Sequence, residues 1–349
     1  MRKIIVFPTF WISIYTWGYL IFLGIGLLSY LNLHDSYWWL TILHSLTFYW
    51  FLPLFTIIPI AYFTRRGTLA LFASIALVLF LVFYGGLFLS RPQSDPPTGP
   101  TLKVMTYNVM EVNSNTAWIG QTVVESGADV VGFQELQPTI ANTIHGSLSE
   151  LHPYQTSDGQ GAESSESGNS LISRYPIQLL EDALPGPWHS PSLVCIMEFN
   201  EETILVINLH AVQSKIGSLD PAAISRATQI REQQARNLVA FAAETNLPLI
   251  VMGDFNTTDK NKDYRIITRT LKDAWREAGW GFGHTFGLRL HTFGTDRPFG
   301  LAFLLPRWLL RIDYVFYSPQ WKVSDVRLGK WDQVSDHRPV ITTLELQTR

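Results

Sequence analysis

Acidic, amide and histidine side chains recur at the ends of apolar runs in the second part of this chain. Asp and Asn alone favour such places as turn formers. Their repetition at the ends of six apolar runs is hard to explain by turn formation alone. The strand ends of open α/β sheets form ligand sites, so these side chains could converge on one site. Carboxylate and amide oxygens without a thiolate suit Mg²⁺ or Mn²⁺, and nearby histidines suit proton transfer. The side chains are Asn108, Glu135, Asn208, His210, Asp254, Asn256, Asp313, Asp336 and His337.

Apolar runs rich in β-branched residues predict the strands that must position these groups. Helical patterns intervene at Thr116–Ser126, Thr139–Glu150 and Ser225–Glu244. Strands alternating with helices, mixed with adjacent strand pairs, indicate a layered α/β domain. The predicted strands are Leu102–Val109, Asp129–Phe133, Ser170–Ile172, Leu193–Phe199, Thr203–Leu209, Leu247–Met252, Ile312–Tyr317 and Val340–Leu346.

The polar residues belong to short segments that follow one another in a fixed order. These are Met105-Thr106-Tyr107-Asn108, Gly132-Phe133-Gln134-Glu135, Gly168-Asn169-Ser170-Leu171-Ile172-Ser173-Arg174, Asn208-Leu209-His210, Gly253-Asp254-Phe255-Asn256, Arg311-Ile312-Asp313-Tyr314 and Ser335-Asp336-His337-Arg338-Pro339. In their order and in their residues they resemble the segments of the endonuclease/exonuclease/phosphatase superfamily of deoxyribonuclease I-like proteins. The resemblance covers nearly all of residues 101–346. It implies a four-layered α/β sandwich, with two sheets face to face and helices outside.

The same resemblance implies a bound Mg²⁺ ion, with Mn²⁺ as an alternative. It assigns the ion to Asn108 and Glu135, with Asp336 close by, and places Asn169 in contact with the substrate. The DNA-repair members of the superfamily carry a further acidic residue two places after the first asparagine. This chain has Met110 there, which disfavours DNA repair.

The resemblance also assigns the proton transfers. Asp254 would orient and deprotonate the attacking water, and Asn256 would fix its geometry. His337, paired with Asp313, would contact the phosphate as an acid–base group. His210 would stabilise charge on the phosphoryl oxygens. A histidine at this place resembles the deoxyribonuclease and sphingomyelinase-type branches, where repair enzymes carry tyrosine.

Other polar residues are weaker candidates. His145, His152 and His189 have no motif around them and are predicted to lie on the surface. Asp273 is expected to be a capping or structural residue, and His284 belongs to a predicted loop on the substrate side.

Three long apolar stretches precede the α/β pattern, at Thr9–Leu33, Tyr37–Phe63 and Thr68–Ser90. Each exceeds the roughly 20 helical residues needed to cross a bilayer core of about 30 Å. None contains Asp, Glu, Lys or Arg, and transmembrane helices are therefore predicted. Pro53 is expected to kink the second helix, and His44 to make a helix–helix hydrogen bond.

These patterns divide the chain into a membrane region (1–90), a proline-rich linker (91–100) and a catalytic domain (101–349). The basic residues of the short flanks and loops lie before the first helix and between the second and third. The positive-inside rule then predicts a cytoplasmic N-terminus and an extracytoplasmic catalytic domain, periplasmic or at the cell surface. The residues concerned are Arg2, Lys3, Arg65 and Arg66.

The predicted function is a membrane-anchored phosphodiesterase, with lipid headgroups as the favoured substrates and the lipid bilayer as partner. An extracytoplasmic endonuclease or exonuclease is the first alternative, and a non-catalytic binding or scaffold protein the second. The net charge of −3 and the lack of a basic cluster disfavour nucleic acid, whose affinity comes largely from Lys and Arg on phosphates. No protein partner is predicted.

One further apolar segment, Phe299–Leu310, precedes the strand that carries Asp313. It is either a core element of the domain or an interfacial element that dips into the bilayer beside the site. Trp308 beside Arg307 suits a headgroup boundary.

Overall fold

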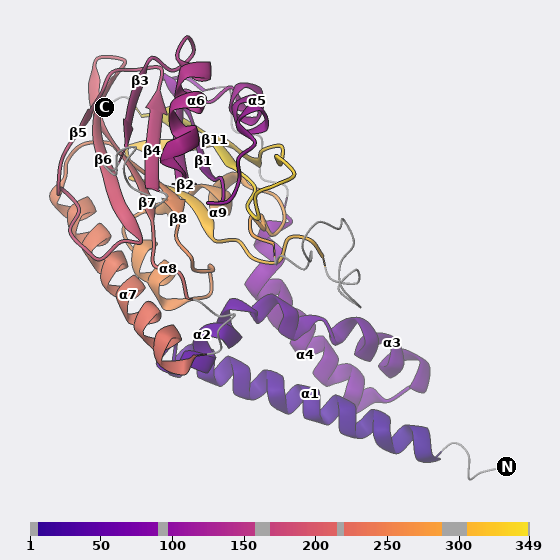
Figure 1. The fold of residues 1–349 in the computed structure, drawn as a ribbon. Coiled ribbons are helices and arrows are strands. Elements are labelled where there is room, and N and C mark those ends of the chain that lie inside the picture. Colours follow the sequence, from indigo (N-terminus) through magenta and orange to yellow (C-terminus); the bar gives the residue numbers. More distant parts are fainter. Residues whose placement is uncertain (1–5, 90–96, 158–167, 215–219, 288–305, 348–349) are drawn as a thin grey trace.

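The computed structural model describes residues 6–89, 97–157, 168–214, 220–287 and 306–347. An α/β body rests on one end of an elongated group of apolar helices (Figure 1). Most of the proline-rich linker lies outside the described residues. Its last part is fixed to the body, because the backbone N–H groups of Thr98 and Gly99 donate to Glu345 Oε1 at 2.7 and 2.8 Å.

The described strands form two six-stranded sheets, in the orders β11-β12-β1-β2-β4-β3 and β5-β6-β7-β8-β10-β9. β1 is parallel to β2 and β7 is parallel to β8, whereas β10 is antiparallel to β8. The bounds are β1 Thr101–Asn108, β2 Val130–Leu136, β3 Tyr154–Ser157, β4 Gly168–Ser173, β5 Ile177–Leu179, β6 Ser190–Phe199, β7 Glu202–His210, β8 Leu249–Asp254, β9 Lys272–Asp273, β10 Asp313–Tyr317, β11 Trp321–Leu328 and β12 Val340–Leu346.

Alternation along each strand divides the apolar side chains between two sides of each sheet. In β1, Val104 faces the core between the sheets, while Met105 and Tyr107 face outward. The outer face of the first sheet is covered by α5 and α6, and that of the second sheet by α7 and α8 (Figure 1). This confirms the predicted four-layered sandwich. The helices are α5 Thr116–Ser126, α6 Pro138–Leu148, α7 Pro221–Glu244, α8 Lys262–Ile267 and α9 Ala274–Ala278.

Helix α7 shows why these segments begin where they do. The Asp220 side chain accepts hydrogen bonds from the N–H groups of Ala222 and Ala223, and Pro221 occupies the first turn. An aspartate cap followed by proline is a strong helix start. The helix therefore begins about a turn before the predicted Ser225.

The N-terminal part contains, within the described residues, three helical stretches long and apolar enough to cross a membrane. These candidate spans are Phe10–Asn32, Thr47–Thr64 and Gly67–Leu87. The elements are α1 Val6–Asn32, α2 Trp38–Ser45, the 3₁₀ helix η1 Thr47–Phe51, α3 Leu54–Thr64, α4 Gly67–Tyr84 and the 3₁₀ helix η2 Gly85–Leu87.

The second predicted helix, Tyr37–Phe63, is wrong as a single kinked span, because the chain breaks into α2, η1 and α3. Pro53 has no N–H to continue the helical bonds of the preceding turn. The Trp50 indole N–H donates to the Leu43 carbonyl at 3.0 Å across the break. Only the part from Thr47 onward remains a candidate span, and α2 packs against α7 of the α/β body.

The contact between the two parts is polar and buried. The Asp35 carboxylate, in the loop after α1, accepts the backbone N–H of Lys262 at 2.6 Å. It also hydrogen-bonds His44 Nδ1 at 2.8 Å. Asn261 donates to the Thr41 carbonyl at 3.2 Å. Each part therefore contributes a backbone group to this contact, the Lys262 N–H from the α/β body and the Thr41 carbonyl from the helices.

His44 makes the predicted helix–helix contact as well, because its Nε2 lies 3.5 Å from Ser29 Oγ of α1. Its second ring nitrogen serves the docking contact through Asp35. One buried imidazole thus links α1, α2 and the loop that holds the α/β body.

Candidate active site

The polar residues at the strand ends converge at one end of the sandwich. In β8, Met252 points into the core between the sheets, and alternation sends Asp254 to the same side. The same alternation delivers Asn108 from β1, His210 from β7 and Asp313 from β10. The site is therefore an extension of the core beyond its last apolar layer.

Gly253 permits the close approach of β7 and β8 next to the site. Its φ is 152°, and a Cβ atom there would lie 2.0 Å from the Leu209 carbonyl oxygen. No other residue fits this position without moving the backbone. The glycine lets β7 and β8 approach so that His210 and Asp254 stand opposite each other in the ladder.

Among the described residues, two groups of potential metal ligands share Asp254. The Asn108 amide nitrogen donates to both Glu135 Oε1 and Asp254 Oδ2 at 3.0 Å. Two carboxylates beside a side-chain amide are an oxygen-rich set without sulfur, which fits Mg²⁺ or Mn²⁺. The groups are Glu135 with His210 and Asp254, and Asp254 with Asp313 and His337.

Glu135 reaches this group through an unusual backbone. Its φ is 56°, and the pairing of β2 with β4 shifts register between Phe133 and Leu136. Such a conformation is costly for a non-glycine residue and is often found at functional sites. Burial acts to raise the pKa of the Glu135 carboxyl, but His210 and the Asn108 hydrogen bond outweigh burial and lower it.

Asp254 is the most basic carboxylate of the site. Burial, followed by the nearby charge of Asp313, raises the pKa of Asp254 to about 8. The backbone N–H of Asn256 donates to Asp254 Oδ1 at 2.8 Å, from a residue with a φ of 50°. The Asn256 amide nitrogen donates to the Ala211 carbonyl at 3.0 Å, which fixes the turn after β8.

His337 forms a buried pair with Asp313, whose Oδ2 lies 2.9 Å from His337 Nδ1. Burial acts to lower the pKa of His337, but Asp313 and Asp254 together raise it to about 10. The imidazole is thus a cation at neutral pH. The Ser335 hydroxyl accepts the His337 N–H at 3.0 Å and donates to the Asn108 carbonyl at 2.8 Å, which ties this loop to β1.

His210 has the opposite character. Burial lowers its pKa to about 3 although Glu135 lies nearby, so the imidazole is neutral. Its Nε2 lies 3.6 Å from Asp254 Oδ2 and 3.8 Å from Glu135 Oε1. His189, exposed as predicted, places its ring 4.5 Å from the His210 ring.

Two of the sequence-predicted site residues stand apart from these groups. Asn169 is buried and donates to the Pro191 carbonyl at 2.8 Å, beside the strand that pairs with His210. Asp336 belongs to neither ligand group, although its charge contributes to the raised pKa of His337. The others, Asn108, Glu135, His210, Asp254, Asn256, Asp313 and His337, come together.

The prediction that His152 lies on the surface is wrong. Its ring is buried, and Nε2 lies 2.9 Å from the Ala128 carbonyl just before β2. His145 is half-buried, with Nε2 2.8 Å from Ser170 Oγ. Each ring thus contacts a residue of the first sheet or its approach, Ser170 in β4 or Ala128 before β2, and neither belongs to the ligand groups. Asp273 has the expected capping role, accepting the Trp275 N–H at 2.9 Å.

Asn208 has a role that its sequence position did not reveal. From β7 it donates to the Phe133 and Ser170 carbonyls of the facing sheet, at 2.9 Å each. It also accepts from the Gln134 amide at 2.5 Å. A Cβ atom at Gly132 would lie 2.7 Å from this side chain. Asn208 therefore joins the two sheets directly behind the site, a role that its place in the segment Asn208-Leu209-His210 did not indicate.

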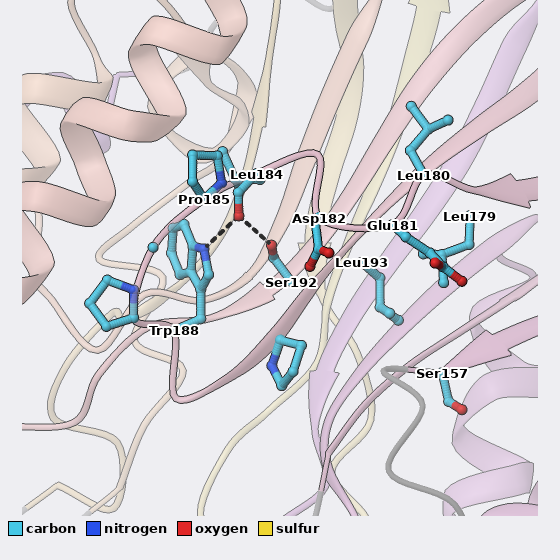
Figure 2. A pocket seen from close by; sticks show the side chains of 13 residues that line it. Ser157, Leu179, Leu180, Glu181, Asp182, Leu184, Pro185, Trp188, Ser192 and Leu193 are labelled. Atoms are coloured by element: carbon cyan, nitrogen blue, oxygen red, sulfur yellow. Dashed lines mark hydrogen bonds between the residues drawn. The ribbon is translucent and has the colours of Figure 1, made fainter.

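A pocket of about 590 Å³ is lined in part by Leu184, Trp188 and Ser192 (Figure 2). Trp188 Nε1 and Ser192 Oγ both donate to the Leu184 carbonyl, at 3.3 and 3.5 Å, and so shape its wall. The residue after the lining residue Trp188 contacts a candidate site residue, because the His189 backbone N–H donates to the His210 carbonyl at 3.0 Å. Among its lining residues the charged ones, Glu181 and Asp182, are both acidic, which disfavours a polyanion there.

Comparison with known proteins identifies a family and a fold. The model of the Endonuclease/Exonuclease/phosphatase family matches residues 105–337. No curated protein matches this chain.

Solved structures of low sequence identity share the fold. A family protein from Bacteroides thetaiotaomicron is 19% identical with a TM-score of 0.50, over 72% of this chain and all of the other. D. rerio TDP2 complexed with a single-strand DNA product is 17% identical with a TM-score of 0.52, over 70% of this chain and 99% of the other. The human Nocturnin catalytic domain with bound sulfate is 16% identical with a TM-score of 0.51, over 72% and 97%.

Proposed function

This chain belongs to the Endonuclease/Exonuclease/phosphatase family, and from that premise we propose that it is a membrane-anchored, Mg²⁺-dependent phosphodiesterase acting on lipid headgroups. The observation that carries the activity is the pair of ligand groups that share Asp254. One group supplies carboxylates for a cation, and the other supplies a charged histidine. In-line attack on a phosphodiester needs an activated water, a cation and help for the leaving oxygen.

The residues divide these tasks by their charge states. Asp254, with its raised pKa, is a suitable base for the proton of the attacking water. His337 is an imidazolium that can hydrogen-bond a phosphoryl oxygen or protonate the leaving oxygen. His210 is neutral and offers a ring N–H to the developing charge. Mg²⁺ held by Glu135 and Asn108 would neutralise phosphoryl charge.

The position of the site supports a membrane-proximal substrate. The turn that follows Asp254 leads directly into Asn261 and Lys262, which hydrogen-bond the loop and helix of the membrane part. The catalytic end of the sandwich is therefore the end that faces the apolar helices (Figure 1). A headgroup phosphoester at the bilayer surface lies within reach of such a site, whereas a long nucleic acid must enter between body and membrane.

The test is a substrate panel with the full-length protein in nanodiscs and Mg²⁺. Phospholipids, sphingomyelin, DNA and the soluble diester bis(p-nitrophenyl) phosphate are compared. We expect lipid hydrolysis that EDTA abolishes. Glu135→Gln and Asp254→Asn should each lower the rate by about 10³-fold or more, because charge neutralisation and water activation each contribute several kcal/mol. Glu125→Gln, at an exposed glutamate on α5, is the matched control.

Each other outcome rejects a defined part of this proposal. Hydrolysis of DNA without lipid hydrolysis would replace it by the nuclease alternative. Full activity in excess EDTA or in either carboxylate variant would remove the metal-assisted mechanism. No hydrolysis of any substrate would favour the scaffold alternative.

A further inference from the structure

We propose that Arg307 and Arg338, stacked on Trp331 and Trp308, form a binding site for the anionic headgroup of a phospholipid next to the catalytic end. This inference deepens the proposed function. It rests on that function only for the claim that the bound lipid belongs to the enzyme's substrate class. The site itself is defined by four side chains from two segments, the one before β10 and the loop between β11 and β12.

The four side chains alternate between cation and ring. The Arg307 guanidinium carbon lies 3.5 Å from the centre of the Trp331 ring, and that of Arg338 lies 4.6 Å from the centre of Trp308. The two indoles meet edge to face with centres 5.7 Å apart. Stacking holds both planar guanidinium groups in fixed orientations, which leaves their N–H edges available for a ligand.

Neither arginine has a carboxylate partner within the part of the chain that the structure describes. Arg338 donates to the His284 carbonyl, but its Nε is buried without a hydrogen-bond partner. By contrast, the buried Arg231 and Arg311 are paired with Asp263 and Asp273 at 3.0 and 2.7 Å. A half-buried cation without a counter-charge is costly, and an anionic ligand would remove that cost.

The cluster lies between the catalytic groups and the apolar helices. Arg338 directly follows His337, and its side chain turns toward His284 rather than into the ligand groups. The His284 ring contacts Phe48 of η1, with centres 6.1 Å apart. Tyr49 of η1 donates to the Leu309 carbonyl at 3.0 Å, beside Trp308. Tryptophan and arginine side chains at this level suit the headgroup layer.

A phosphate-bearing anionic lipid matches these groups best. A guanidinium binds phosphate through two parallel N–H bonds, and the indoles suit the boundary between headgroup and acyl chains. A third nearby cation, Lys330, is already paired with Glu125 at 3.3 Å, so among the described residues of this cluster only the two arginines lack a carboxylate partner. That amount of charge suits one headgroup rather than a nucleic-acid backbone.

The test measures binding without hydrolysis. Full-length Asp254→Asn protein is purified in detergent and titrated with phosphatidylglycerol or phosphatidylcholine, and bound lipids are counted by native mass spectrometry. We expect preferential retention of phosphatidylglycerol. Adding Arg307→Gln together with Arg338→Gln should weaken it about tenfold or more, the scale of a lost charge-assisted pair. Arg307→Gln alone, at an exposed residue, should weaken it without unfolding, and Lys330→Gln should leave it unchanged.

Equal retention of the two lipids, or retention unaffected by the arginine substitutions, would overturn the proposal. Full displacement of the lipid by millimolar inorganic phosphate would show a free-anion site instead. These outcomes are independent of hydrolysis, so a failure of the proposed phosphodiesterase activity is seen separately in the substrate panel.

Discussion

In the proposed mechanism, Asp313 would act on the reaction only through His337. Its carboxylate is buried and lies 2.9 and 3.1 Å from the same ring nitrogen, on the side of the imidazole away from Asp254. This pairing keeps the His337 pKa near 10 despite burial. The protonation state of His337 is therefore set by a residue that does not itself face the substrate.

This pairing predicts strong non-additivity. Asp313→Asn should lower activity by about 10²-fold to 10⁴-fold, the usual contribution of an acid–base group, because His337 loses its charge. The high-pH limb of the kcat/KM profile should move to lower pH in this variant, because His337 then loses its proton at lower pH. His337→Gln should cost about as much, and the double variant little more. Multiplicative losses in the double variant would contradict the pairing.

His284 predicts a pH dependence of stability. Burial lowers its pKa to about 4, against about 6.5 when exposed. Between these values the unfolded chain binds a proton that the native chain does not. Stability is therefore lost as pH falls from 6.5 toward 4, by up to about 3 kcal/mol from this residue.

His284→Asn should remove this contribution, since asparagine can donate to the Trp308 carbonyl that His284 Nδ1 contacts at 3.1 Å. Thermal unfolding midpoints of both proteins, measured from pH 7 to pH 4.5, provide the check. The wild-type midpoint should fall more steeply. Parallel curves would mean that His284 is protonated in the native protein.

At the scale of elements, the loop from β8 to α8 joins the candidate site to the N-terminal apolar helices. It begins at Asp254 and ends at Asn261 and Lys262, both of which contact the membrane part. The buried Asp35 carboxylate makes most of that contact, because it hydrogen-bonds Asn261 and Lys262 on one side and His44 on the other. The loop after α1 is thereby a support of the site as well as a connection between helices.

Asp35→Ala should release this support. It leaves the Lys262 N–H and the buried Nδ1 of His44 without their partner, at a cost of about 1–3 kcal/mol each. The rate on bilayer lipid should fall by about 10²-fold, as for a misplacement of about 1 Å, with a smaller effect on a soluble diester. Asp325→Ala, at an exposed aspartate, is the control. Equal losses on both substrates would indicate general misfolding.

At the scale of the whole molecule, the loops that connect the apolar helices lie at two opposite ends of the helix group. The loop with Asp35 and the 3₁₀ helix η2 after α4 both contact the α/β body. In η2, the Leu87 carbonyl accepts the Gly281 N–H at 2.7 Å. Arg66, between α3 and α4, contacts Ser13 near the far end of α1. This arrangement places the first loop on the side of the α/β body and the basic loop on the other.

Cysteine labelling would test this topology together with the proposed orientation. Cys195 is buried, so the background with an impermeant maleimide on intact cells is low. Ser36→Cys, in the exposed first loop, should be labelled from outside, whereas Thr64→Cys should be labelled only after lysis. The reverse pattern would place the catalytic domain in the cytoplasm.

The sequence by itself determined a layered α/β domain, because strand and helix patterns are local properties. The resemblance of its short polar segments to a known superfamily implied the sandwich and most of the site's members. Polar residues that continue an inward-facing series, as Asp254 continues Met252, must extend the core at a strand end. The lengths of the apolar stretches likewise predicted three membrane-crossing candidates.

Only the tertiary structure decided features that join residues far apart in the chain. One of them is the packing of α2, the first part of the second apolar stretch, against α7 of the α/β body. Three further contacts are of this kind. They are the hydrogen bonds of Asn208 between the sheets, the bond of Asn261 to Asp35 and the stacking of Arg307 on Trp331. In each case the partner is set by the packing of whole elements, and no local pattern encodes it.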